Sequence, residues 1–119
     1  MITGAHFLLY SPDPEADRAF FRDVLRFPSV DAGHGWLIFG LPPAELAVHP
    51  TDGGAQMHSE LYLMCDDLQE VLRTLEAQGI PHTEVTQERW GVKTTIRLPS
   101  GGEVGLYQPS HPTALGLAR

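Results

Sequence analysis

Two side chains capable of acid–base chemistry each open an otherwise apolar segment of the 119-residue sequence. His6 lies in the run GAHFLLY, and Glu60 lies in the run SELYLMC. A carboxylate in an apolar segment needs a partner when that segment is buried. Three roles are therefore open for Glu60: an ion pair with Arg97 or Lys93, contact with a ligand, or proton transfer as a general base. For His6 we expect a hydrogen-bonded side chain in the wall of a pocket.

The alternation of residue types indicates which side chains accompany these two. Side chains two residues apart point to the same face of a strand. The faces of the two segments would hold His6, Leu8 and Tyr10 on the first, and Glu60, Tyr62 and Met64 on the second. The opposite faces are purely apolar and are expected to pack beneath helices. The mixed faces would then enclose a polar and aromatic pocket, of the kind that binds small molecules.

The candidate ligand-binding residues follow from this arrangement. The predicted pocket is lined by His6, Trp36, Glu60, Tyr62, Arg97 and Tyr107. Trp90 precedes a strand in a loop-like stretch, where it would form a lid. The aromatic side chains could stack on a flat ligand or pack in a core. No pattern of partners is evident for the remaining candidates, His34, His82 and His111.

Two helices are predicted from capping residues and apolar periodicity. The first begins at Asp13 and carries apolar residues at helical spacing as far as Phe27. Its acidic residues are interpreted as part of a solvated face: Glu15, Asp17 and Asp23. The second begins at Asp67 with a capping box and ends at Gly79.

The order of the predicted elements repeats along the chain. Strands are predicted at 4–10, 34–41, 45–49, 59–65, 82–88, 92–98 and 103–108. Each half is interpreted as a strand, a helix and three strands, and Leu-Pro pairs end matching strands in the two halves. We expect one domain over 1–119, made of module one (about 3–50), a linker (51–57), module two (about 58–109) and a tail (110–119).

Charge and composition exclude several classes of function. Eight basic and fifteen acidic residues give a net charge of −7. Nucleic acids and anionic membrane surfaces attract clustered positive charge, which this sequence lacks. The single cysteine, Cys65, cannot form an internal disulfide, and no apolar run approaches the roughly 18 residues of a membrane helix. With no signal-peptide pattern either, we expect a cytoplasmic protein that binds neither nucleic acid nor membrane.

Residues 3–109 resemble the vicinal oxygen chelate superfamily, which includes glyoxalase I, extradiol dioxygenases, bleomycin-resistance proteins and fosfomycin-resistance enzymes. The resemblance rests on the twofold βαβββ order and on three segments: AHFLLYSPDPEADRAFFRDVL, ELYLMCDDLQEVLRTLEAQGI and LPSGGEVGLYQP. It implies an α+β fold in which two βαβββ modules form a half-open barrel around one cavity. It also implies a homodimer, because family members often pair and sometimes exchange modules.

The resemblance further implies where a divalent metal would bind. Four ligand positions lie on pocket-facing strands, and His6 and Glu60 occupy two of them. The position on the last strand, usually a glutamate, is Gly105, and its counterpart in the first half is Leu46. Neither of these side chains can coordinate a metal, whereas zinc and iron sites normally use at least three protein ligands. His49 could supply a third ligand only from a bulged strand.

These observations favour a glyoxalase/bleomycin-resistance-like protein that binds a small aromatic or hydrophobic molecule in its cavity, beside an incomplete metal site. Two alternatives remain. One is a divalent-metal-dependent lyase, isomerase or dioxygenase of glyoxalase or dioxygenase type, acting on a vicinal-oxygen substrate with Glu60 as a catalytic residue. The other is an interaction module with a vestigial pocket. Fold alone does not choose among them, because one fold carries many functions.

Overall fold

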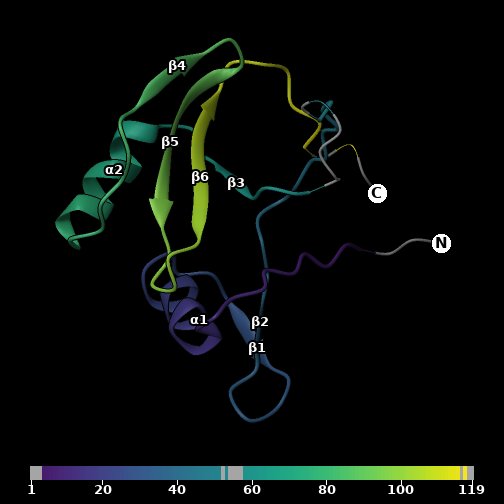
Figure 1. Ribbon diagram of the computed structural model, residues 1–119, viewed down its shortest axis with the longest axis vertical. Coiled ribbons are helices and arrows are strands. Elements are labelled where there is room, and N and C mark those ends of the chain that lie inside the picture. The colour runs from purple at the N-terminus through teal and green to yellow at the C-terminus, as the bar shows by residue number, and fades with distance from the viewer. Residues whose placement is uncertain (1–3, 52, 54–57, 116, 118–119) are drawn as a thin grey trace.

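The described part of the chain combines two helices with six short strands in an α+β arrangement (Figure 1). The computed structural model describes residues 4–51, 53, 58–115 and 117, so most of the predicted linker and the last residues of the predicted tail lie outside the described residues. The elements are α1 (Pro14–Asp23), β1 (Ser29–Asp31), β2 (Leu37–Phe39), β3 (Tyr62–Met64), α2 (Leu68–Ala77), β4 (Thr86–Glu88), β5 (Gly91–Arg97) and β6 (Glu103–Pro109). Neither described helix has the length and apolar character needed to cross a membrane.

The larger sheet has four strands in the order β3-β6-β5-β4. β3 runs parallel to β6, with Tyr62 opposite Gly105, and the other neighbours are antiparallel, with Lys93 opposite Tyr107. α2 lies between β3 and β4 in the sequence and packs against one face of this sheet (Figure 1). From β3 to β6 the chain therefore follows the βαβββ order that was predicted for the second half.

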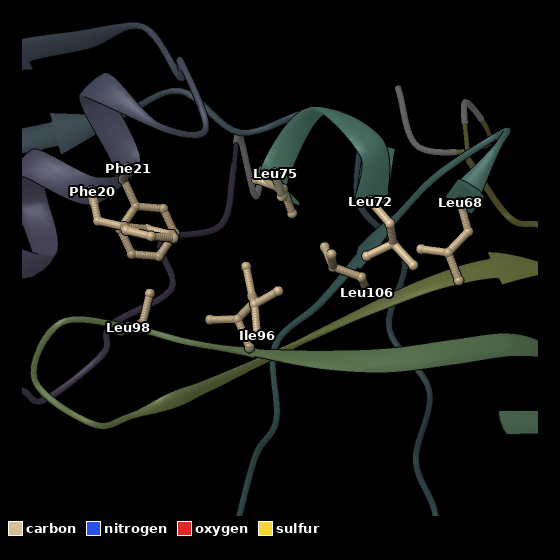
Figure 2. Close-up of a cluster of buried hydrophobic side chains, with 9 residues drawn as sticks. Phe20, Phe21, Leu68, Leu72, Leu75, Ile96, Leu98 and Leu106 are labelled. Atoms are coloured by element: carbon tan, nitrogen blue, oxygen red, sulfur yellow. The ribbon is translucent and has the colours of Figure 1, made fainter. Parts of the chain in front are cut away.

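The buried face of α2 forms the centre of the core. Its side chains at helical spacing are between 1 and 3 % exposed: Leu68, Leu72 and Leu75. Ile96 of β5 and Leu106 of β6 lie across from them (Figure 2) and are equally inaccessible. Burial of such side chains contributes about 1.5–3 kcal/mol each. The predicted apolar stripe of this helix is thus the contact that fixes it to the sheet.

Both ends of α2 agree with the sequence-based prediction. The Asp67 carboxylate accepts a hydrogen bond from the backbone N–H of Glu70 at 3.2 Å, which satisfies a free amide of the first turn. The backbone N–H of Leu68 donates to the side-chain oxygen of Gln108 at 2.9 Å and so ties the helix to β6. After the helix, Gly79 adopts a φ of 74°, a left-handed conformation that glycine adopts without a steric penalty.

α1 joins the same core through its aromatic side chains. Phe20 and Phe21 are 6 and 8 % exposed and belong to the cluster built on α2 and the larger sheet (Figure 2). The Phe21 ring also lies 5.8 Å from the ring of Phe39 on β2 and 6.1 Å from that of Phe27. α1 therefore connects the first half of the chain to the second.

Asp17 of α1 is not part of a solvated face, as the sequence pattern had suggested. It is only 7 % exposed, and its carboxylate accepts hydrogen bonds from the backbone N–H and the hydroxyl of Ser100, at 3.1 and 2.7 Å. Ser100 lies in the turn between β5 and β6. The charge is tolerated in the interior because both carboxylate oxygens have donors.

The first half is less regular than the sequence predicted. Its sheet has two strands, β1 and β2, with Val30 opposite Ile38. The prediction of strands at 4–10 and 45–49 is wrong for this structure, since both segments are irregular and mostly exposed. A strand requires a neighbouring backbone to bond with, and neither segment has one here. Within the described residues no barrel closes.

Two further boundaries differ in the first half. α1 ends at Asp23 instead of continuing to Phe27, and Arg26 adopts a φ of 64° as the chain turns away. The strand predicted at 34–41 is confined to β2, because residues 32–36 form a turn in which the Asp31 carboxylate accepts from two glycine N–H groups. β1 itself was not predicted, since three residues carry too little periodicity to be recognised.

Replacing Asp17 with alanine leaves the Ser100 donors without their acceptor, so we expect the free energy of unfolding to fall by about 1–3 kcal/mol. Urea unfolding followed by circular dichroism measures this change. The matched control is Asp23→Ala on the same helix, whose carboxylate pairs with Arg22 in solvent and should contribute little. Equal losses in the two variants would contradict the role assigned to Asp17.

His82 links α2 to the edge of β5, although no partner was foreseen for it. Its Nε2 lies 2.8 Å from a carboxylate oxygen of Glu76 and its Nδ1 lies 2.7 Å from the carbonyl oxygen of Thr83. Both neighbours are acceptors, so the charged imidazolium, which donates from both nitrogens, suits them best. The hydrogen bond to Glu76, and then that to Thr83, raise the pKa of His82 above its usual value of 6.5.

The raised pKa of His82 predicts a pH-dependent contribution to stability. The contribution is complete below the usual pKa of 6.5 and disappears as the pH rises through the raised value. Glu76→Gln should therefore lower the melting temperature more at about pH 5.5 than at about pH 8.5, where wild type and variant should converge. Glu84→Gln, an exposed carboxylate with no contact recorded in the described structure, is the control. A loss that is the same at both pH values would contradict the assignment.

Candidate functional site

The face of the larger sheet that α2 leaves uncovered carries the candidate site. On β3, Leu61, Leu63 and Cys65 pack toward the core, so Tyr62 points the other way. On β6, Val104 and Leu106 are buried under α2, and Gly105 and Tyr107 lie on the opposite face. This alternation was predicted from the sequence, and the structure confirms it for the second half.

Three aromatic side chains meet on this face and are called the aromatic cluster below: Tyr62, Trp90 and Tyr107. Their ring centroids lie 5.1–5.9 Å apart, and each pair meets nearly at right angles, between 81° and 89°. Edge-to-face contact places the positive rim of one ring against the negative face of another. The Lys93 ammonium lies 5.8 Å from the Trp90 ring centre, within range of a cation–π contact.

Gly105 makes the aromatic cluster possible. It is paired with Tyr62 across the β3–β6 ladder, and the Tyr62 ring lies directly on its Cα. A Cβ atom built at this position would overlap ring atoms of Tyr62, including its Cγ, which cannot move without the whole side chain. Gly105 is therefore required for space, because any side chain here would displace the Tyr62 ring.

The same geometry bears on the metal site that the family resemblance implies. The Tyr62 ring occupies the space that a carboxylate at position 105 would need. Leu46 and His49 are exposed on an irregular segment, as are His6 and Glu60 on theirs. No group of three or more His, Cys, Asp or Glu side chains converges among the described residues. The side chains present do not fit a divalent metal centre, and we derive no chemical step through one.

Two further residues lie beside the aromatic cluster: His111 of the C-terminal tail, for which the sequence showed no partner, and Glu45 of the irregular segment 45–49. The imidazole Nε2 of His111 lies 3.1 Å from the Tyr107 hydroxyl, and its Nδ1 lies 2.7 Å from the carbonyl oxygen of Pro112. Because that carbonyl can only accept, Nδ1 carries a proton, and in the neutral imidazole Nε2 then accepts from the Tyr107 hydroxyl. A carboxylate oxygen of Glu45 lies 3.8 Å from the same Nε2.

The environment of Tyr107 favours its neutral, proton-donating form. Its side chain is only 8 % exposed. Burial, and secondarily the charge of Glu45, raise the pKa of Tyr107 above its usual value of 10.0. Tyr107 is therefore a hydrogen-bond donor over the whole physiological pH range. Sequence reasoning gave Glu45 no role and found no partner for His111, because the contacts of both residues form only in the folded chain.

The remaining predicted site residues lie outside the aromatic cluster. Glu60 is exposed, and Arg97 pairs with Glu103 at 3.6 Å in solvent. The expectation that Glu60 is buried beside a basic side chain is therefore wrong for this structure. His6 is also exposed, and Trp36 stacks under the Arg18 guanidinium at 4.8 Å, beside α1.

A hollow of about 670 Å³ lies between α1 and the turn that joins β1 to β2, away from the aromatic cluster. Its lining includes Arg18 and Arg22, but Arg22 is bonded to Asp23 at 2.7 Å and Arg18 is stacked on Trp36. Both arginines of this open groove are thus already engaged, and its described lining includes no Phe, Tyr or Trp ring. We therefore place the candidate site at the aromatic cluster.

Comparison with known proteins identifies the fold. No protein-family model and no curated protein sequence matches the chain. Among solved structures it is similar to TnmS3, an antibiotic binding protein from Streptomyces sp. CB03234, at 23 % identity and a TM-score of 0.66, covering 92 % of this chain and 99 % of that one. It is also similar to a lactoylglutathione lyase from Agrobacterium tumefaciens, at 22 % identity and a TM-score of 0.64, covering 89 % and 92 %.

A glyoxalase/bleomycin resistance protein from Streptomyces sp. CB03234 matches at 22 % identity and a TM-score of 0.57, over 82 % of this chain and 93 % of that one. The chain thus has the fold of these structures over most of its length, which agrees with the fold that the sequence resemblance implied. At these identities the likeness is one of fold, and the two activities named above belong to those neighbours.

The contact between Gly105 and Tyr62 predicts a strongly coupled pair of substitutions. Gly105→Ala should lower the free energy of unfolding by about 1–3 kcal/mol and weaken the near-ultraviolet circular dichroism of the aromatic cluster. In a Tyr62→Ala background the same substitution should cost much less, because the overlapping ring is gone. Gly102→Ala is the control, since a Cβ there meets only ordinary contacts. If the cost at Gly105 is the same in both backgrounds, the ring does not occupy that space.

Proposed function

We propose that the protein binds a small aromatic or hydrophobic molecule against the aromatic cluster. The observation that carries this proposal is the gathering of three aromatic rings on the sheet face that α2 leaves uncovered, around a glycine that keeps the face open to them. Aromatic walls with a few polar groups are characteristic of small-molecule sites, and Tyr107 and Lys93 supply such groups. The similarity to an antibiotic-binding protein supports this choice.

The proposed cavity is the half-open barrel implied by the family resemblance, with one wall from each of two βαβββ modules. The second wall would come from the first half of the chain, whose segments 4–10 and 45–49 lack strand partners here. Their large apolar side chains are between 41 and 92 % exposed: Phe7, Leu8, Leu9, Tyr10, Leu46 and Val48. Apolar segments in this state gain free energy by pairing, and β3 offers an unpaired sheet edge.

A second copy of this chain is the partner we propose for those segments. In a homodimer the unpaired segments of one chain could complete the sheet of the other, and His6, Trp36, Glu60 and Arg97 would then approach the aromatic cluster as ligand-binding residues. A metal-dependent reaction is not proposed, because the Tyr62 ring fills the position of an essential ligand. The alternative of a vestigial pocket differs from our proposal in requiring no ligand response at all.

The proposal is tested by a thermal-shift screen of planar aromatic metabolites and antibiotics, followed by fluorescence titration. In a Trp36→Phe variant Trp90 is the only remaining tryptophan, so its quenching reports on the aromatic cluster. We expect a binder to raise the melting temperature and to quench Trp90. Tyr62→Ala should weaken that binder about two- to tenfold, the value of one aromatic contact.

Two results would count against this function. One is a screen in which no compound both stabilises the protein and quenches Trp90. The other is binding that is equally strong in Tyr62→Ala, since the ligand would then sit elsewhere. Elemental analysis of protein purified without a histidine tag is the parallel control, because one zinc, iron, manganese or nickel per chain would restore the metalloenzyme alternative.

A further inference from the structure

The ring that stacks on Tyr107 in this structure belongs to the protein itself. Tyr62 and Trp90 meet Tyr107 edge-on, at 89° and 81°, whereas the His111 imidazole lies nearly parallel to it, at 24° with 6.0 Å between ring centres. His111 is therefore the one ring of this group that stacks on Tyr107. A flat ligand bound to Tyr107 in the same way would occupy the place that His111 now fills.

The polar contacts of His111 also resemble those of a bound ligand. Its Nε2 accepts a hydrogen bond from the Tyr107 hydroxyl at 3.1 Å. Its ring plane is held by the second nitrogen, Nδ1, which donates to the carbonyl oxygen of Pro112 at 2.7 Å. Tyr107 thus has both an aromatic partner and an acceptor for its proton, and both come from one heteroaromatic ring.

The segment that carries this ring is held down at few points. Residues 110–115 are called the strap here. At its start, Ser110 donates its backbone N–H to the carbonyl oxygen of Trp90 at 2.9 Å. Beyond Ser110, the recorded polar contacts that tie the strap to the rest of the described chain are those of His111 and a hydrogen bond from the Ala114 N–H to Glu45 at 2.7 Å. Glu45 holds this anchor from an otherwise exposed, irregular segment.

We propose that the strap closes the binding site, with the His111 imidazole standing in for the ligand on Tyr107, and that a ligand enters by displacing it. The inference rests on the proposed function and names its ligand class. To replace both contacts of His111, the ligand must be a planar heteroaromatic ring. It must also have an unprotonated ring nitrogen that accepts a hydrogen bond from the Tyr107 hydroxyl. Because only the open site binds, the closed strap reduces the apparent affinity in proportion to the fraction of time that the site is open.

Benzimidazole and indole are the matched probes for this inference. Both are planar bicyclic rings of nearly equal size, but only benzimidazole has a ring nitrogen with a free acceptor lone pair. Their dissociation constants are measured by calorimetry for wild type and for His111→Gly, which removes the stand-in ring. Thr113→Gly is the control, because it changes an exposed residue of the same strap and keeps the ring and the recorded contacts of the strap.

We expect His111→Gly to bind benzimidazole about tenfold more tightly than wild type, corresponding to a site that is open about one tenth of the time. Thr113→Gly should bind like wild type, and indole should gain much less than benzimidazole. Glu45→Ala provides a second route to the open state without deleting the ring, because it removes both the acceptor of the Ala114 N–H and the carboxylate beside His111. It should also tighten benzimidazole binding, even if His111→Gly were to fold poorly.

The outcomes separate this inference from the function it rests on. If benzimidazole binds wild type, His111→Gly and Glu45→Ala equally and binding is weakened in Tyr62→Ala, the aromatic cluster is a binding site and the strap does not close it. If indole gains as much as benzimidazole, the strap is supported and the ligand class is overturned. If neither these probes nor the aromatic compounds of the wider screen bind any variant, both proposals fail together.

Discussion

The two-sided burial of β6 is the constraint on which the rest of the structure depends. This strand lies between β3 and β5, and its successive side chains alternate between two different environments. Val104 and Leu106, at 0 and 2 % exposure, meet the apolar face of α2, while Gly105 and Tyr107 face the aromatic cluster. A shift of register by one residue would exchange these sets and place a tyrosine in the aliphatic core. The packing of α2 and the geometry of the candidate site are therefore set by the same register.

The described first half of the chain has no strand that is buried on both faces as β6 is. This difference explains why the sequence-based prediction was more accurate for the second half. In the second half, alternation on β3, β5 and β6 and the capped, striped α2 were predicted because each is decided by local pattern and by burial against a neighbour within the half. The segments 4–10 and 45–49 have equally apolar sequences, but strand formation also depends on a partner backbone that no local pattern reports. Asp17 was misjudged for the same reason, since its partner, Ser100, is distant in sequence.

The residues of the candidate site likewise fall into those that local sequence pattern predicted and those that it did not. Tyr62 and Tyr107 were placed on one face by alternation, and Trp90 by its position before a strand, and the structure brings all three together. The contacts of Glu45 and His111 could not be predicted, because they join the irregular segment 45–49 to the C-terminal tail and to Tyr107. The absence of a side chain at Gly105 was noted as the lack of a metal ligand, while its positive role, as the floor beneath the Tyr62 ring, required the three-dimensional structure.

That floor has a consequence for how this protein can diverge from others of the same fold. The side chain of an acidic residue at position 105 would overlap the Tyr62 ring. Replacing Tyr62 alone with a smaller residue would leave an empty space above Gly105. On steric grounds each single change should be less stable than the present pair, so we expect positions 62 and 105 to change together. A protein of this fold with a side chain at position 105 is then expected to carry a smaller residue than tyrosine at position 62.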